Sequence, residues 1–309
     1  MTILQYYFVD VFAESKYSGN QLAVFRNAEG LTKEQMQTIA FEINFSETTF
    51  IASDDIRNGG FDVRIFTPGS EIPFAGHPTL GTAFIIKEQI LQETVDRINL
   101  NLGVGQIPVD LTYSNGKLGD LWMKQVNPTF INTLGIDQLA PVLGIDHDAF
   151  DSAFPIEEIS TGIPFIIVPL KSLDVLRRIS VNQEKYNEFI HRYNPDLNNP
   201  DADKTPATAF FVFCPETYEA GNDINARMFD GFFGIPEDPA TGSANGCFLS
   251  YLLKHNYFGK SELDLKVEQG YEIKRPSLLN IRGKKLSESE YDIFVGGKVQ
   301  MIAKGEWLV

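Results

Sequence analysis

The chain has 309 residues, 43% of them hydrophobic and 22% charged, which suits about two globular domains and excludes a disordered, collagen-like or coiled-coil protein. Forty-one acidic residues outnumber 26 basic ones, and a net charge of −15 repels nucleic-acid backbones and anionic membrane surfaces, so we expect neither as a partner. The two cysteines, Cys214 and Cys247, are too few for a disulfide framework or a thiolate metal cluster and fit a reducing compartment.

The first predicted elements are two strands followed by a helix. Apolar runs at 6–12 and 22–25 flank a turn-rich segment and are typical of strands. Thr32 and Gln35 make a capping box, and Asn44 is expected to end the helix. The apolar residues between them recur at the spacing of one helical face, at Met36, Ile39, Ala40 and Ile43.

Two further predicted strands, at 48–52 and 61–66, precede a segment rich in glycine and proline. This segment, 73–81, reads Pro-Phe-Ala-Gly-His-Pro-Thr-Leu-Gly. We expect it to be a turn that leads into an apolar helix over 82–88. Nothing in residues 1–10 forms the basic region and apolar run of a secretory signal, and we expect a cytoplasmic protein.

A short sequence pattern occurs twice, with every position shifted by 163 residues. The first copy is Arg64-Ile65-Phe66 with Ile72-Pro73, and the second is Arg227-Met228-Phe229 with Ile235-Pro236. Each copy precedes a Gly/Pro/Thr-rich turn that begins a predicted helix, at 79–87 and 243–255. We infer two related halves of α+β class, each with one long helix and one short helix after the turn, although a chance match remains the alternative.

The boundary between the halves is expected within 111–128. Asn115-Gly116 predicts a tight hairpin turn there. Residues 194–206, rich in proline and asparagine, are expected to form a solvent-exposed loop.

Both glycine turns place backbone N–H groups at the start of a helix, where unpaired donors and the helix dipole attract an anion such as a carboxylate. Candidate proton-transfer groups accompany them, because His77 lies within the first turn and Glu237-Asp238 directly precedes the second. Glu47, at the edge of a predicted strand between apolar and hydroxyl residues, is a candidate general base. The plain alternatives are two capped helices and a surface glutamate.

Other chemistries find weaker support in the sequence. The segment from Gly242 to Gly246 is similar to the nucleophile elbow of hydrolases around Ser243, but Thr241 stands where that motif needs glycine. Gly103-Val104-Gly105 lacks the third glycine of a nicotinamide-binding turn. The histidines are scattered rather than clustered, so we expect no metal, at His77, His147, His191 or His255.

The same segments resemble the phenazine-biosynthesis isomerase (PhzF-like) family over nearly the whole chain. The resemblance rests on Gly19-Asn20, 44–50, 73–81 and Glu-Asp-Pro-Ala-Thr-Gly-Ser-Ala at 237–244, with further matches at 269–270, 275–277 and 295–299. It implies the diaminopimelate-epimerase fold, with two similar α+β domains that are each a barrel-like mixed sheet around a central helix. The implied domains are 1–118 with 298–309, and 119–297, and the implied active site lies in the cleft between them.

The resemblance also implies an activity, which is cofactor-independent isomerisation by a homodimer. A proton would move between carbons of a small, cyclic or conjugated carboxylic acid. Glu47 matches the family's catalytic general acid/base, and His77 and Asp238 match catalytic residues that support it. The implied substrate-binding positions are Asn20, Gly76, Gly242 and Ser243.

Related amino-acid racemases use one cysteine from each domain as a pair of bases. The equivalent positions in this chain are interpreted as Ala75 and Ala240, so two-thiol racemisation is not expected. Cys247 is expected to be a buried, inert residue. The alternative functions are a non-catalytic metabolite-binding protein of the same fold, and a hydrolase that uses Ser243.

Overall fold

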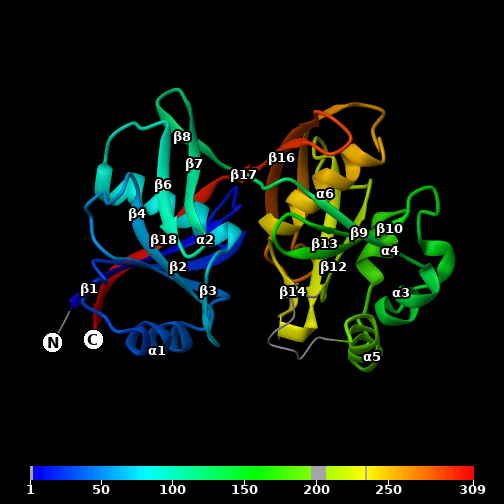
Figure 1. Ribbon diagram of the computed structural model, residues 1–309, viewed down its shortest axis with the longest axis horizontal. Helices are drawn as coiled ribbons and strands as arrows, with labels where there is room; N and C mark the ends of the chain where they lie inside the picture. The colour runs from blue at the N-terminus through cyan, green and yellow to red at the C-terminus, as the bar shows by residue number, and fades with distance from the viewer. Residues whose placement is uncertain (1–2, 196–206, 234) are drawn as a thin grey trace. The chain divides into compact units, whose positions relative to one another are not determined.

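The computed structural model describes residues 3–195, 207–233 and 235–309 (Figure 1). The chain divides into two compact units: unit 1 comprises Met1–Lys124 and Gly296–Val309, and unit 2 comprises Gln125–Val295. Most of the predicted loop at 194–206 lies outside the described residues. Both units combine curved sheets with helices, and the prediction of an α+β fold is confirmed.

Unit 1 is a mixed sheet that curves around one helix. Its strands are β1 (Ile3–Val11), β2 (Asn20–Arg26), β3 (Glu47–Ile51), β4 (Phe61–Phe66), β5 (Glu71–Ile72), β6 (Arg97–Leu102), β7 (Gly105–Ser114), β8 (Lys117–Lys124) and β18 (Val299–Leu308). They pair in the order β18-β1-β2-β3-β4-β6-β7-β8, with β2–β3 and β4–β6 parallel and β5 added to β4. Helix α2 (Gly76–Ile85) contacts strands from both ends of this order, which shows that the sheet wraps around it (Figure 1).

Burial, rather than helix propensity, holds α2 in place. Every residue of α2 except Phe84 is buried, and a π-helical turn, Ile86–Leu91, continues it. A Cβ at Gly81 would lie 2.5 Å from Leu22 Cδ2 and 2.9 Å from Val11 Cγ2, so glycine is what lets the helix approach the sheet. The predicted start, at 79 or 82, is wrong, because the glycine-rich segment itself forms the first turns of the helix.

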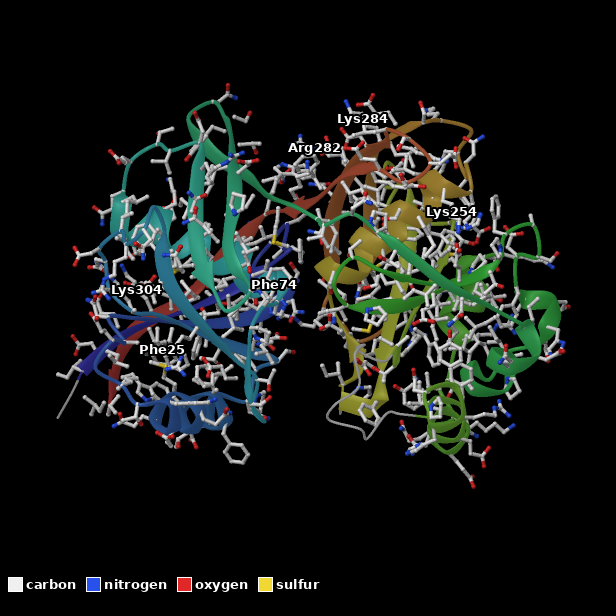
Figure 2. All side chains as sticks on the ribbon, in the orientation of Figure 1. Phe25, Phe74, Lys254, Arg282, Lys284 and Lys304 are labelled. Atoms are coloured by element: carbon white, nitrogen blue, oxygen red, sulfur yellow. The ribbon has the colours of Figure 1, made fainter. Side chains whose placement is uncertain are left out.

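Helix α1 (Lys33–Ile43) forms as predicted and covers the other face of this sheet. Thr32 and Gln35 form the reciprocal capping box, and Asn44 ends the helix in a left-handed conformation. The buried face of α1 packs on three phenylalanines of the sheet, Phe25, Phe50 and Phe66, the first of which is labelled in Figure 2. The predicted hairpin turn at Asn115-Gly116 joins β7 to β8, with both residues at positive φ.

Unit 2 repeats the same sequence of strand pairings. Its strands are β9 (Thr129–Leu134), β10 (Ile156–Ser160), β11 (Pro164–Pro169), β12 (Ala209–Cys214), β13 (Ile224–Asp230), β14 (Ile235–Asp238), β15 (Glu262–Gln269), β16 (Ser277–Lys285) and β17 (Tyr291–Gly297), the last of which runs into unit 1. The order is β9-β10-β11-β12-β13-β15-β16, with β11–β12 and β13–β15 parallel and β14 added to β13.

The described residues of unit 2 form four α-helices, not the predicted two. They are α3 (Ile136–Leu143), α4 (Leu173–Arg178), α5 (Gln183–Tyr193) and α6 (Gly242–Lys254). The helix after the glycine turn, α6, lies within one residue of the predicted span 243–255 and, at 13 residues, is the longest of the four and not the shorter helix of its half. All of α6 except Ser243 and Lys254 is buried, so it occupies the place that α2 has in unit 1.

The two copies match with an offset that changes along the chain. The offset is 163 residues in β4 and β13, where Ile65 corresponds to Met228. In the next strand it is 166 residues, because Ile65 pairs with Ile72 whereas Met228 pairs with Asp238 (238 − 72 = 166). The helices begin at Gly76 and Gly242, an offset of 166. The predicted match of Ile72-Pro73 with Ile235-Pro236 is therefore wrong, because a 3-10 turn, Gly231–Phe233, lengthens the second copy between its strands.

Candidate functional site

Strand pairing and a helix start bring together the predicted residues of unit 1. The parallel register sets Leu22 of β2 beside Glu47, the first residue of β3. His77 is the second residue of α2, and its Nε2 lies 3.2 Å from Glu47 Oε2. Asn20 begins β2 and is also buried. The side chains of Glu47 and His77 are 15% and 8% exposed, so the pair is largely shielded from solvent.

The electrostatic state of this pair follows from its burial. Desolvation lowers the pKa of His77 from 6.5 to about 3, against a hydrogen bond to the Gln21 backbone that raises it. The distance to Glu47 would allow an ion pair, but we assign a neutral imidazole, because burial disfavours the charged ring and holds the pKa of His77 well below neutral pH. The contact between Nε2 and Oε2 does not meet hydrogen-bond geometry, so the neutral imidazole is a close polar neighbour of the Glu47 carboxyl and the mobile proton belongs to that carboxyl.

The start of α2 offers backbone donors beside this pair. The Ala75 backbone is extended, and its side chain does not cap the helix. Pro78 has no N–H, which leaves the Gly76 and His77 amides as N–H groups at the positive end of the helix without an intrahelical acceptor. The hydroxyl of Thr79 donates to the Ala75 carbonyl at 2.7 Å and fixes the first turn.

In unit 2 the predicted Asp238 is the last residue of β14 and is 6% exposed. The Thr241 hydroxyl donates to Asp238 Oδ2. Gln269 Nε2 donates to the Asp238 carbonyl at 2.9 Å and to Thr241 Oγ1 at 3.0 Å. Asn245 Nδ2 donates to the Thr241 carbonyl at 3.0 Å, so buried hydrogen bonds link Asp238 to Thr241, Gln269 and Asn245.

The sequence prediction missed the role of Thr241. A threonine before a helix is usually a cap that accepts from the helix N–H groups. Here it makes no such bond, because its hydroxyl is turned to Asp238. Like α2, helix α6 thus begins without a side-chain cap, at the predicted residues Gly242 and Ser243.

The predicted candidate Glu237 has a different role from Asp238. Arg227 binds both of its carboxylate oxygens, with Nε to Oε1 at 3.0 Å and Nη2 to Oε2 at 2.7 Å. The guanidinium also donates to the Leu176 carbonyl at 2.9 Å and lies over the Phe229 ring. Both side chains are 8% exposed, so Glu237 anchors β14 through a buried ion pair. Its two carboxylate oxygens are therefore engaged by Arg227.

One of the two positions predicted to match the racemase cysteines, Ala240, is wrong by one residue. The residues that precede the two helices are Ala75 and Thr241, so the position matched to Ala75 within this chain is Thr241 and not Ala240. Neither carries a thiol. Cys247 is buried beside Thr161, and burial raises the pKa of its thiol to about 12, in keeping with the inert residue that was expected.

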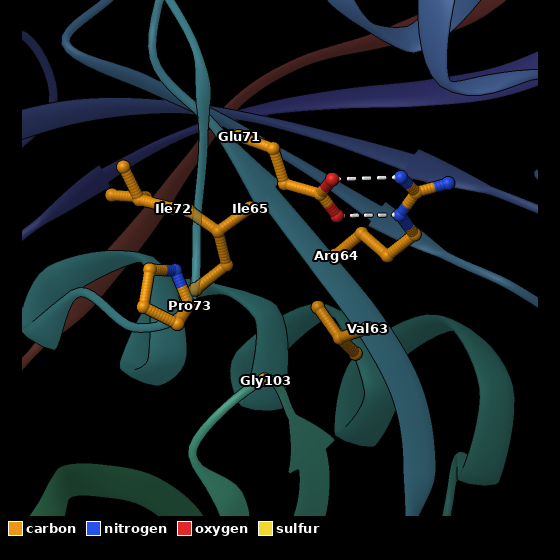
Figure 3. Close-up of a pocket in the computed structure, with 7 residues that line it drawn as sticks. All are labelled: Val63, Arg64, Ile65, Glu71, Ile72, Pro73 and Gly103. Atoms are coloured by element: carbon orange, nitrogen blue, oxygen red, sulfur yellow. Dashed lines mark hydrogen bonds and ion pairs between the residues drawn. The ribbon is translucent and has the colours of Figure 1, made fainter.

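A hollow of about 330 Å³ in unit 1 does not have the chemistry of the site (Figure 3). Its lining is mostly apolar, and its two charged groups, Arg64 and Glu71, bind each other at 2.7 and 2.9 Å. Gly103, which also lines it, lies in the hairpin between β6 and β7 and packs on Pro73. Gly103 and Gly105 thus lie in a β-turn and not at the start of a phosphate-binding helix.

Among the described residues no helix is long and apolar enough to span a membrane.

Comparison with known proteins identifies the family of the chain. The family model for phenazine biosynthesis-like proteins matches residues 9–305. The trans-2,3-dihydro-3-hydroxyanthranilate isomerase of Pseudomonas aeruginosa is 32% identical over 301 residues, which cover 97% of this chain and 98% of that protein.

Solved structures extend the comparison. A PhzF-family phenazine biosynthesis protein from Bacillus anthracis superposes with a TM-score of 0.87 and 28% identity, over 100% of both chains. A hydroxyproline epimerase from Agrobacterium vitis, 8% identical, matches with a TM-score of 0.60 over 98% of this chain and 92% of that one. At this identity, the second likeness concerns the fold alone.

Proposed function

The chain belongs to the phenazine biosynthesis-like family and is an isomerase, and from this premise we propose that Glu47 moves a proton between two carbons of a small carboxylic acid. The observation that carries the proposal is the buried contact of 3.2 Å between Glu47 Oε2 and His77 Nε2, in surroundings that lower the pKa of His77 to about 3. We propose a cyclic, conjugated acid of the kind named for the Pseudomonas aeruginosa relative, trans-2,3-dihydro-3-hydroxyanthranilate.

The proposed reaction needs no redox partner. Glu47 takes a proton from a carbon next to the conjugated system, and the electron pair of the broken C–H bond delocalises over that system. The Glu47 carboxyl then returns the proton to another carbon, so one C–H bond breaks, one forms and the double bonds shift. His77, whose Nε2 lies 3.2 Å from Glu47 Oε2, packs against the carboxyl and keeps it in place.

The substrate carboxylate needs a positive partner in a protein whose net charge is −15. We propose that the helix-terminal amides, Gly76 and His77 in unit 1 and Gly242 and Ser243 in unit 2, supply it. Donors that are aligned before the reaction stabilise the negative charge of the delocalised carbanion, which is usually the largest contribution to catalysis. In this proposal Asp238 hydrogen-bonds a polar group of the same substrate, Asn20 contributes a further polar contact, and the enzyme is a homodimer.

Turnover of trans-2,3-dihydro-3-hydroxyanthranilate in D2O, followed by NMR and mass spectrometry, tests the proposal. We expect an isomer of unchanged composition that carries deuterium at one ring carbon. Binding without isomerisation or exchange at any carbon would favour a metabolite-binding protein of the same fold. Sensitivity to serine-directed phosphonates together with cleavage of ester substrates would favour the hydrolase with Ser243.

A further inference from the structure

Gln269, the last residue of β15, has a buried side-chain amide whose orientation is fixed by its partners. Its Oε1 accepts from the backbone N–H of Thr241 at 3.2 Å, and its Nε2 donates to the backbone carbonyl of Asp238 at 2.9 Å. A backbone N–H can only donate and a carbonyl can only accept. Exchanging the two ends of the amide would therefore break both bonds.

This orientation decides where the Thr241 hydroxyl proton points. Gln269 Nε2 lies 3.0 Å from Thr241 Oγ1 and donates to it. The hydroxyl has a single proton of its own, and its other partner is Asp238 Oδ2. The three side chains, at most 9% exposed, thus form a one-way chain of donors that runs from Gln269 through Thr241 to Asp238.

A close backbone approach keeps Gln269 at this place. Gly270 has a φ of +78°, and a Cβ there would lie 2.4 Å from the Arg275 carbonyl and 2.7 Å from the Pro239 carbonyl. Because only glycine tolerates both the conformation and the contact, the turn after Gln269 rests directly on the residue that follows Asp238. The Arg275 N–H closes this turn on the Gly270 carbonyl at 2.9 Å.

We propose that Gln269 is a positioning residue that acts through Thr241 to keep Asp238 ionised and oriented as a hydrogen-bond acceptor for the substrate. A donor to a carboxylate favours its charged form, and an ionised carboxylate can accept but not donate. The substrate group that meets Asp238 is therefore a hydroxyl or an ammonium group. This inference rests on the proposed function, which places Asp238 on the substrate.

Variants of Thr241 separate the direction of the hydrogen bond from the packing of the side chain. Thr241→Val keeps the branched shape and removes the donor, whereas Thr241→Ser keeps the donor. With trans-2,3-dihydro-3-hydroxyanthranilate as substrate, we expect Thr241→Val to lower kcat/KM roughly 10- to 100-fold, the range for a hydrogen bond to a charged group. The acid limb of its pH profile moves to higher pH, and Thr241→Ser restores most of the loss.

A second measurement does not need turnover. Carbon-13 NMR follows the titration of the Asp238 carboxyl, identified as the signal that Asp238→Asn removes. We expect the titration midpoint to rise in Thr241→Val and in Gln269→Glu, which replaces the donor to Thr241 by an acceptor. Equal midpoints in wild type and in either folded variant would overturn the proposal. If the titration midpoint rises in the variants but the wild-type protein does not isomerise the substrate, the donor chain is supported. The proposed function is then the part that is contradicted.

Discussion

The central helices of the two units, α2 and α6, begin with the same backbone arrangement, but different ionisable side chains lie beside their first turns. Both helices follow an extended residue, Ala75 or Thr241, and in both the residue four positions later bonds to its carbonyl, from Thr79 at 2.7 Å and from Asn245 at 3.0 Å. In unit 1 the neighbouring ionisable group is Glu47, which lies 3.2 Å from the buried imidazole of His77. In unit 2 it is Asp238, bound to a hydroxyl. In the proposed function, one repeated backbone motif therefore supports a proton carrier in one copy and a hydrogen-bond acceptor in the other.

The strand before each helix shows a second difference between the copies. Each carries a glutamate held at both oxygens by an arginine that lies over a phenylalanine, as Arg64–Glu71 over Phe66 and Arg227–Glu237 over Phe229. The side chains of the first pair are 38% and 25% exposed, and those of the second are both 8% exposed. The same contact should therefore contribute very different amounts to stability.

Removing the buried arginine is expected to have the larger effect on folding. Arg227→Met leaves the Glu237 carboxylate buried without its partner and frees the carbonyls at the end of α4, for which we expect a loss of about 3–5 kcal/mol in the free energy of unfolding. Denaturant titration measures it. The double variant Arg227→Met, Glu237→Leu should recover part of the loss, and equal stability of the single variant and wild type would show that the pair is not buried in solution.

The neutral state of His77 can be tested by the pH dependence of stability. Its pKa is about 3 in the folded protein and 6.5 ordinarily, so between these values the unfolded chain binds more protons and stability falls as pH falls. The contribution is about 1.4 kcal/mol per pH unit below 6.5, or about 2 kcal/mol between pH 7 and pH 5. His77→Phe should flatten the dependence by this amount.

Glu47 also titrates next to His77, so the same comparison is made in a Glu47→Gln background. There too we expect His77→Phe to flatten the pH dependence. An unchanged slope in both backgrounds would mean that His77 is charged in the folded protein, and the pair would then be an ion pair.

The exposed arginine gives the smallest expected effect. Arg64 lowers the pKa of Glu71 to about 2, but solvent screens a pair this exposed. Arg64→Met is therefore expected to reduce the free energy of unfolding by about 1 kcal/mol or less. Denaturant titration alongside Arg227→Met measures the difference, and equal losses in the two variants would contradict the comparison of the two copies.

Local signals predicted some elements closely and misplaced others for physical reasons. Helix α1 matches its prediction because the capping box of Thr32 and Gln35 and the left-handed Asn44 are encoded within a few residues. Helix α2 was predicted to begin too late because Gly76, Pro78 and Gly81 disfavour a helix locally, whereas burial inside the curved sheet stabilises it.

The site residues were identified through sequence motifs, but their interactions were not. The contact between Glu47 and His77 depends on the parallel pairing of β2 with β3 and on the placement of α2, which no local pattern specifies. The bond from Thr241 to Asp238 competes with the capping role that threonine usually has before a helix. The ion pair with Arg227, whose guanidinium is also held by the Leu176 carbonyl of α4, is what separates Glu237 from the candidate acids.

The most direct test of the account compares Glu47→Gln with a matched control, Glu42→Gln, whose side chain is exposed on α1 only five positions away. Both variants are given trans-2,3-dihydro-3-hydroxyanthranilate in D2O, and deuterium incorporation into substrate and product is measured over time. Positioned acid–base groups contribute roughly 10²- to 10⁴-fold to rate, so we expect Glu47→Gln to lose at least about 10²-fold and Glu42→Gln to match wild type. Isomerisation by a folded Glu47→Gln at the wild-type rate would show that Glu47 is not the proton carrier.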